Sequence, residues 1–277
     1  MDGIHLCWII IILILLIIAC IIIILSKSND TNNISVEKMD VIEPNSFPFQ
    51  TFIINLDRKK ERYDYVAKQL DNLGISNYKR WSATDGFNID PTEMIADGIS
   101  QKLINKGKGF AGCASSHVRI WKHIRDNKLD WTLILEDDVH FHPQFIAIFY
   151  KYWKHVPIDA KIVFPGYYDM PKNDKQLILN QSVMCLHGYM VNSEAAEYLL
   201  QYLLPMDDPI DVHITEHFRN NYGSFIFNGM VTINNIRPDD YKLNNGDKCM
   251  FNGIIYQNRE EYGRTIYKEN TTFNNHD

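Results

Sequence analysis

The chain has 277 residues and a mass of 32.4 kDa, which suits one medium-sized domain with an accessory segment, because single hydrophobic cores stop growing near roughly 250–300 residues. Its formal charge of −6 and pI of about 5.9 exclude a protein that holds nucleic acid through a broad basic surface. Its cysteines form no C-x-x-C pair, which also argues against a structural zinc ribbon.

The N-terminal residues form a candidate membrane anchor. The run from Leu6 to Leu25 carries no charged residue, and about 20 apolar residues suffice to cross a hydrocarbon core of roughly 30 Å. A cleavable signal peptide fits less well, because its apolar region is about 7–15 residues long and follows a charged segment. We therefore predict a transmembrane helix at residues 6–25, which makes the chain a single-pass membrane protein.

The orientation of this anchor stays open. Lys27 and Lys38 follow the span and no Lys or Arg precedes it, which places the C-terminal side in the cytoplasm. Glycosylation sequons at Asn29, Asn33, Asn180 and Asn270 point to the opposite side, but they are about as many as chance supplies in so Asn-rich a chain and do not decide the orientation. We expect the protein in a secretory-pathway membrane, with its domain in the lumen, or in another host-derived membrane.

Composition divides the chain into an anchor, a polar stem, a folded domain and an Asn-rich tail. The predicted boundaries are 1–25 for the anchor, 26–48 for the flexible stem, 49–248 for the domain and 249–277 for the tail. Cys113 and Cys185 lie in the domain and Cys249 begins the tail, and the sequence does not decide whether any of them forms a disulfide.

The domain begins with a strand, a helix and a second strand. The apolar run 50–56 predicts a buried strand, and Asp57 is a candidate cap for a helix that ends near Gly74. Residues 75–83 predict the next strand. This order is typical of the first half of a nucleotide-binding α/β sheet.

The later pattern continues the alternation of strands and helices. We predict helices at 92–96, 114–126, 143–153 and 193–204, strands at 131–135, 161–165, 182–191 and 230–233, and a mobile basic loop with Lys102, Lys106 and Lys108. Ser193 is the expected cap of the helix at 193–204. The predicted fold class is α/β with a mainly parallel central sheet.

An acidic run follows the apolar strand 131–135. Side chains alternate along an extended strand, so Glu136 and Asp138 should project to one side and Asp137 to the other. Mg²⁺ and Mn²⁺ prefer such carboxylate oxygens and can bridge a diphosphate. The sequence thus predicts a metal site formed by Glu136 and Asp138, with a solvated acidic turn as the open alternative.

Four blocks in the sequence share their order and spacing with one family. They are Asn55-Leu56-Asp57-Arg58, Ala83-Thr84-Asp85-Gly86, Lys108 to His117, and Leu135-Glu136-Asp137-Asp138. The chain resembles glycosyltransferase family 25, which groups bacterial lipooligosaccharide galactosyltransferases with procollagen galactosyltransferases. The resemblance implies a GT-A fold, a UDP-sugar donor, Mn²⁺ or Mg²⁺, and transfer of galactose or glucose with inversion. It also implies a glycan or a hydroxylysine-bearing, collagen-like protein as acceptor.

The block that ends at His117 departs from the family pattern. Phe110-Ala111 stands where members usually carry Glu and one further residue, and Ser115 replaces a leucine. If the missing glutamate contacts a substrate, the choice of donor or acceptor would differ.

Several residues are candidates for binding the donor. Arg58 and Arg62 lie one helical turn apart after the first strand, where guanidinium groups could grip a diphosphate. Asp85 could accept hydrogen bonds from the ribose or base, although Asp-Gly is equally a turn former. The resemblance adds His117, and we include Asp137 among the donor-binding residues.

Inverting transfer requires a base that takes the proton of the acceptor hydroxyl. Asp211 is the candidate, because it follows Pro209 at a predicted helix start and matches the family's late acidic position. Helix capping is the competing interpretation of this aspartate.

Two other functions stay open. His213, Glu216 and His217 satisfy the H-x-x-E-H pattern, in which two histidines bind zinc and glutamate activates water, so a zinc hydrolase is one alternative. The other is a catalytically inactive, carbohydrate-binding module with the same fold.

Overall fold

A computed structural model describes residues 47–154, 156, 158, 160–168, 177–179, 184–220, 230–233, 252–253 and 255–257. Within these ranges no helix is both long and apolar enough to span a bilayer. The predicted transmembrane helix at residues 6–25 lies outside these ranges. Residues 26–46 of the predicted stem also lie outside them.

The predicted strand, helix and strand at the start of the domain are confirmed. Strand β1 (Gln50–Asn55), helix α2 (Lys60–Asn72) and strand β2 (Tyr78–Ser82) follow in order, and the two strands pair in parallel. Asp57 does not cap α2, because its carboxylate accepts hydrogen bonds from Arg80 and from the Ser82 hydroxyl. Gly74 follows the helix at a φ of 72°, a conformation that favours glycine.

The central sheet is mixed, with most strands pointing one way. Its order is β2-β1-β3-β7-β5-β8-β6, with β9 paired to β5. The strands not yet defined are β3 (Thr132–Glu136), β5 (Ile162–Tyr168), β6 (Leu177–Leu179), β7 (Met184–Val191), β8 (Met230–Ile233) and β9 (Asn252–Gly253). The pairings make β1, β2, β3, β5 and β8 codirectional, whereas β6, β7 and β9 run the other way. The mixed α/β class and the mostly parallel sheet are thus confirmed.

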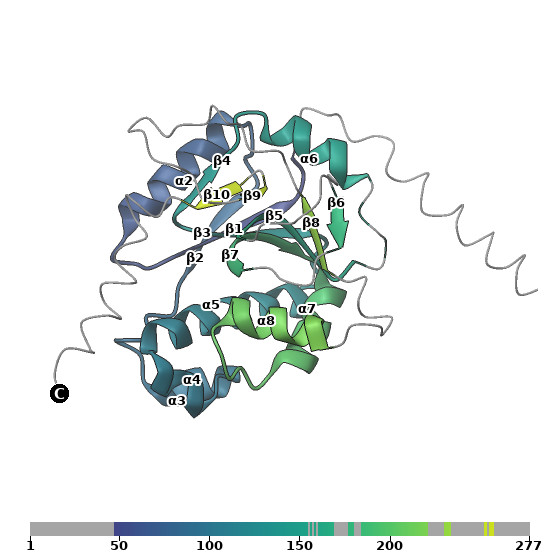
Figure 1. Ribbon diagram of the computed structural model, residues 1–277. Coiled ribbons are helices and arrows are strands. Elements are labelled where there is room, and N and C mark those ends of the chain that lie inside the picture. Colours follow the sequence, from purple (N-terminus) through teal and green to yellow (C-terminus); the bar gives the residue numbers. More distant parts are fainter. Residues whose placement is uncertain are drawn as a thin grey trace, which may run out of the picture. The chain divides into compact units, whose positions relative to one another are not determined.

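Helices cover both faces of the sheet (Figure 1). On one face lie α3 (Pro91–Asp97), α4 (Gln101–Lys106), α5 (Lys108–Asp126), α7 (Ser193–Leu203) and α8 (Ile210–Asn220), and on the other lie α2 and α6 (Phe145–Trp153). Each face has its own hydrophobic core, with Trp121 at the centre of the first and Phe149 in the second, both fully buried. Burial of such side chains stabilises the fold by about 1.5–3 kcal/mol each.

The predicted basic loop is wrong, because Lys102 and Lys106 lie in α4 and Lys108 is the first residue of α5. The Ser100 hydroxyl accepts a hydrogen bond from the Leu103 N–H and so caps α4, and Leu103 itself is fully buried. Helix α5 begins at Lys108, earlier than predicted. The cap of α7 is Asn192 rather than Ser193, since the Asn192 side chain accepts the Ala195 N–H at 2.8 Å.

Two short strands from the predicted tail pair with strands of the domain. Strand β10 (Ile255–Gln257) pairs with β4 (Val139–Phe141), just as β9 pairs with β5. Ile255 is fully buried against two glycines: a Cβ atom on Gly166 would lie 2.6 Å from the Ile255 carbonyl oxygen. The absence of a side chain at Gly166 of β5 and at Gly188 of β7 therefore lets β10 approach the sheet closely.

Candidate active site

The chemically reactive side chains gather at the carboxyl edge of the parallel strands. Leu135, the residue before the acidic run, pairs with Gly188 of the antiparallel strand β7. The first residues of β7, including Cys185 and His187, therefore extend past the end of β3 beside Glu136. Ligands of open α/β sheets bind at this edge.

Glu136 projects toward α5. Its Oε1 lies 3.8 Å from the Cys113 sulfur and 3.6 Å from His117 Nε2. Cys113 and His117 are four residues apart on the same helix, so they share one face. The potential ligand atoms of these three residues all lie within 4.8 Å of one another.

The His117 imidazole is fixed by a buried tyrosine. The Tyr189 hydroxyl lies 2.8 Å from His117 Nδ1 and accepts the Trp121 indole N–H at 2.9 Å. Burial raises the pKa of Tyr189 well above its ordinary value, so the hydroxyl keeps its proton. The hydroxyl can either donate its proton to Nδ1 or accept the Nδ1 proton, so the contact orients the ring in both tautomers, and the tautomer decides whether Nε2 presents a proton or a lone pair to Glu136.

Acidic groups surround the Cys113 thiol. Its pKa is raised by burial and further by the negative charges of Glu136, Asp211 and Asp138. Burial also acts to raise the pKa of Glu136, but the neighbouring His117 and His187 imidazoles and the Cys113 contact together lower it. The two carboxylates predicted to bind metal thus act on one thiol, together with the predicted base.

Asp137 projects to the opposite side, as the alternation of the strand predicts. Its carboxylate accepts hydrogen bonds from Asn55 Nδ2 at 2.8 Å and from Arg62 Nη1 at 3.2 Å. The Arg62 side chain is only 6% exposed. Burial raises the pKa of Asp137 and outweighs the opposing effects of Arg62 and Asn55. Arg62 and Asp137 therefore form a pair on the α2 side, separated by the strand from Glu136.

Arg58 and Asp85 form a second pair at the same edge. Asp85 also accepts hydrogen bonds from the Asn88 side chain at 2.8 Å and from the Phe87 N–H at 3.3 Å. The Arg58 side chain is 40% exposed. This pair belongs to a turn that presents a guanidinium group to solvent.

Two glycines join this turn to α5. A Cβ atom on Gly86 would lie 1.9 Å from the Lys108 carbonyl oxygen, and one on Gly112 would lie 2.6 Å from the Thr84 carbonyl oxygen. Backbone therefore touches backbone between the loop after β2 and the start of α5. Packing thus explains why glycine stands at positions 86 and 112.

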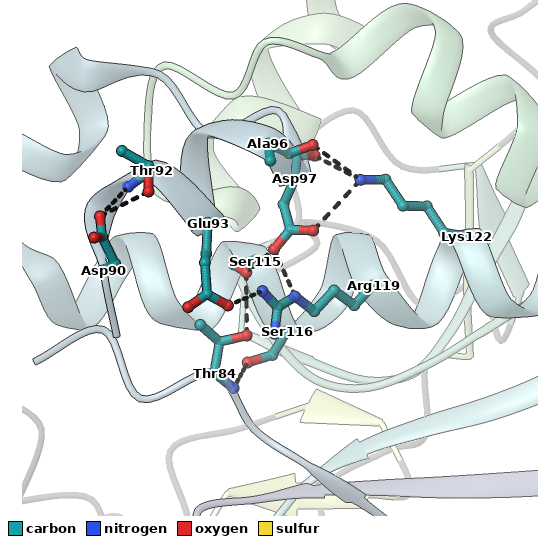
Figure 2. A network of polar contacts seen from close by, with 10 residues as sticks. All are labelled: Thr84, Asp90, Thr92, Glu93, Ala96, Asp97, Ser115, Ser116, Arg119 and Lys122. Atoms are coloured by element: carbon teal, nitrogen blue, oxygen red, sulfur yellow. Dashed lines mark hydrogen bonds and ion pairs between the residues drawn. The ribbon is translucent and has the colours of Figure 1, made fainter. Parts of the chain in front are cut away.

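A polar network that the sequence did not reveal holds the same helix (Figure 2). The Ser115 hydroxyl and Arg119 Nε each donate to Asp97 Oδ2 at 2.6 Å, and the Thr84 N–H donates to the Ser116 hydroxyl at 2.8 Å. Asp97 is 9% exposed, and its charge is balanced by Arg119 and by Lys122, which lies 3.4 Å away. The network ties α3, α5 and the loop after β2 together.

Asp211 lies in the first turn of α8 and faces the start of β7. Its Oδ2 accepts the Cys185 N–H at 3.0 Å and its Oδ1 accepts the Val212 N–H at 2.9 Å. Cys185 has a φ of 65°, a left-handed conformation that is uncommon for a side chain of this type. The carboxylate is thus oriented by backbone donors from two elements.

The histidines of the H-x-x-E-H pattern turn toward α7. His213 Nε2 lies 3.0 Å from the Leu203 carbonyl oxygen, and His217 Nε2 lies 2.9 Å from the Tyr198 hydroxyl. Within the ranges that the structure describes, the acidic and metal-binding side chains that cluster as three ligands are Cys113, His117 and Glu136, and this pattern contributes none of them. The zinc hydrolase gains no support from this geometry.

At this edge of the sheet, the sequence predicted four site residues: Glu136, Asp138, His117 and Asp211. It did not predict Cys113, His187 and Tyr189 as members of the site. The spacing of Cys113 and His117 was a usable signal, since residues four apart on a helix share a face. The places of His187 and Tyr189 depend on the antiparallel insertion of β7, for which the sequence offers no local signal.

Comparison with known proteins identifies the family of this chain. The model of glycosyltransferase family 25 (LPS biosynthesis protein) matches residues 49–214, more than half of the chain. The chain belongs to glycosyltransferase family 25, as its motifs indicated.

Individual relatives are distant. Procollagen galactosyltransferase 2 is 26% identical in Mus musculus and 25% identical in Homo sapiens, each over 194 residues, which cover 61% of this chain and 31% or 30% of the relative. A glycosyltransferase 25 family member of Aedes aegypti is 23% identical over 194 residues, 60% of this chain and 31% of the relative. The chain spans about a third of the length of these curated relatives.

Proposed function

We propose that the chain is a membrane-anchored glycosyltransferase of GT-A type. It moves a hexose from a UDP-sugar to a hydroxyl group, depends on Mn²⁺ or Mg²⁺, and inverts the anomeric centre. The observation that carries the proposal is the gathering of Glu136, Asp138 and Asp211 around one thiol at the carboxyl edge of the sheet in a family 25 chain. The anchor at residues 6–25 and its placement in a secretory-pathway or other host-derived membrane are part of this proposal.

Glu136 and Asp138 are the proposed ligands of the divalent cation. The charges of both carboxylates act on the Cys113 thiol, and carboxylate oxygens suit a hard cation. When bound, such a cation neutralises charge on a departing nucleoside diphosphate. Asp138 is 2% exposed, so its carboxylate is held in one place before the substrate arrives.

The donor would lie along the edge that Arg58 and Asp85 occupy. The exposed Arg58 guanidinium can exchange part of its contact with Asp85 for a diphosphate, and Asp85 is then free to accept from a ribose hydroxyl. Arg62 and Asp137 pair on the α2 side of the sheet. Their pairing orients the backbone segment that carries Glu136 and Asp138. His117 lines the donor site from α5.

Asp211 is the proposed base. Each of its oxygens accepts one backbone N–H, which fixes the plane of the carboxylate and leaves lone pairs for the proton of the acceptor hydroxyl. The names of the murine and human relatives favour galactose as the sugar and a collagen-like protein as the acceptor, with glucose and other glycans as further candidates.

A screen of nucleotide sugars tests the proposal. Purified full-length protein is incubated with UDP-galactose, UDP-glucose and other donors, with Mn²⁺, Mg²⁺ or a chelator, and release of UDP is measured with and without acceptor glycans. We expect one UDP-sugar to be consumed in a metal-dependent manner. Binding of a UDP-sugar without turnover under every condition would identify an inactive carbohydrate-binding module instead.

A further inference from the structure

The Cys113, His117 and Glu136 cluster combines three different ligand types. It contains a sulfur, an imidazole nitrogen and a carboxylate oxygen, held by one helix and the end of one strand. The His117 side chain is 1% exposed, and its Nε2 atom makes no hydrogen bond within the described part of the chain although it points toward Glu136. A buried nitrogen in this position is costly unless something binds it.

The two separations from Glu136 are close to those between ligands of a tetrahedral zinc ion. Bonds of about 2.3 Å to sulfur and about 2.0 Å to nitrogen or oxygen place neighbouring ligand atoms about 3.3–3.6 Å apart. The observed separations from Glu136 Oε1 are 3.8 Å to sulfur and 3.6 Å to Nε2. The third separation, between the Cys113 sulfur and the His117 nitrogen, lies within 4.8 Å, so small side-chain adjustments would bring the three atoms around one ion.

The surroundings are also those of a metal centre. The Tyr189 hydroxyl, 2.8 Å from His117 Nδ1, can accept the Nδ1 proton and so free Nε2 for a metal. The nearby carboxylates of Asp138 and Asp211 add negative charge that favours a cation. The Glu136 side chain is 24% exposed, which leaves a route from solvent and room for water as a fourth ligand.

We propose that Cys113, His117 and Glu136 bind Zn²⁺, or another thiophilic divalent cation, with water completing the shell. Mn²⁺ and Mg²⁺ are disfavoured at these three ligands, because thiolate selects softer cations. The Glu136 carboxylate is shared with the proposed donor-metal site. In a chain that transfers sugar as proposed, Zn²⁺ would therefore compete with Mn²⁺ for Glu136.

Cobalt spectroscopy tests the proposal without any sugar transfer, so its failure is distinguishable from failure of the proposed function. Full-length protein is stripped of metal with a chelator and titrated with Co²⁺, and the sulfur-to-cobalt charge-transfer band is recorded; Zn²⁺ is then added to displace the cobalt. We expect about one equivalent of tightly bound metal and an intense thiolate band that Zn²⁺ abolishes.

Three variants locate the ligands. Cys113→Ser should remove the charge-transfer band and weaken Zn²⁺ binding at least about 100-fold, because it removes a ligand rather than a supporting residue. Cys185→Ser is the matched control, since Cys185 is the other cysteine in the described part of the chain, and it should keep the band. Glu136→Gln should keep the band but weaken binding.

The double variant His213→Gln/His217→Gln provides the decisive comparison. It should bind Zn²⁺ like the unmodified chain. The proposal is overturned if the band persists in Cys113→Ser, if no thiolate band appears in the unmodified chain, or if zinc is lost on substitution of His213 and His217. Circular dichroism of each variant verifies that a lost band does not come from unfolding, and a Cys113→Ser variant that is folded and still binds zinc tightly also refutes the proposal.

Discussion

The Asp211 carboxylate accepts the backbone N–H of Cys185 at 3.0 Å and thereby joins the first turn of α8 to the start of β7. The donor residue is in a left-handed conformation, with a φ of 65°. This contact orients the Asp211 carboxylate and leaves further lone pairs on its oxygens accessible to a proton. That arrangement suits a residue proposed to take a proton from the acceptor hydroxyl.

Asp211→Asn should lower turnover by about 100-fold or more, because general bases contribute about 10²–10⁴-fold to rate. Donor affinity should change much less, since the proposed donor contacts lie on other residues. Steady-state kinetics with varied UDP-sugar separates the two effects. Asp208→Asn, in the loop before the same helix, is the control, and an unchanged rate in Asp211→Asn excludes this residue as the base.

Asp138→Asn should reduce transfer by roughly 100-fold or more, since loss of a metal ligand removes several kcal/mol of charge stabilisation. The variant keeps the size of this buried side chain, so the thermal unfolding midpoint should stay close to that of the unmodified chain. Asp64→Asn, on the exposed face of α2, provides the matched loss of one acidic group. Activity that still responds to Mn²⁺ at the unmodified level would remove Asp138 from the metal site.

Asp137 should make stability depend on pH. Burial raises its folded pKa above the ordinary value of 3.8, so ionising it is harder in the folded than in the unfolded chain. The stability contribution of Asp137 is therefore fully present below pH 3.8 and declines as the pH rises through the folded pKa. Urea unfolding at a series of pH values measures this, with Asp137→Asn as the chain that cannot ionise there.

The free energy of unfolding of the unmodified chain, relative to Asp137→Asn, should fall as the pH rises. A difference that stays constant across the series, or one that increases, contradicts the raised pKa.

Gly86→Ala and Gly112→Ala should each destabilise the fold by about 1–3 kcal/mol or more, because the added methyl group meets backbone atoms that cannot move aside. The clashing distances are 1.9 Å and 2.6 Å, to the Lys108 and Thr84 carbonyl oxygens. Gly74→Ala is the comparison: it meets no atom within 4 Å and suffers only from its φ of 72°. Chemical denaturation that ranks Gly74→Ala as the most damaging of the three would refute the packing argument.

The sequence predicted the elements of the fold well where hydrophobic periodicity is strong. The strand at 131–135 and the helix that carries Trp121 are examples, since apolar side chains repeat at the period of each structure. The error at 102–108 arose because three lysines suggested solvent, whereas Leu103 between them is buried and Ser100 caps the helix. Lysines in a short helix indicate that one face is exposed to solvent, but they do not indicate whether the opposite face is buried.

The site was predictable in part for a similar reason. Glu136 and Asp137 project to opposite sides, as alternation predicts for extended residues, although β3 ends at Glu136 and Asp137 lies in the turn that follows. By contrast, the contact of Glu136 with Cys113 depends on the position at which α5 packs on the sheet, which we call its packing height. That height is set by backbone contact at two glycines and by the buried charge of Asp97, which are properties of tertiary packing.

The direct backbone contact between the loop after β2 and α5 also has a mechanical consequence. Because no side chain stands between Gly86 and Gly112, there is no soft layer to absorb a displacement. Any ligand that pulls on Asp85 must move the first turns of α5 with it, and Cys113 and His117 travel with that helix. The turn therefore moves as one rigid body with Cys113 and His117. A shift of this body changes the position of both residues relative to Glu136.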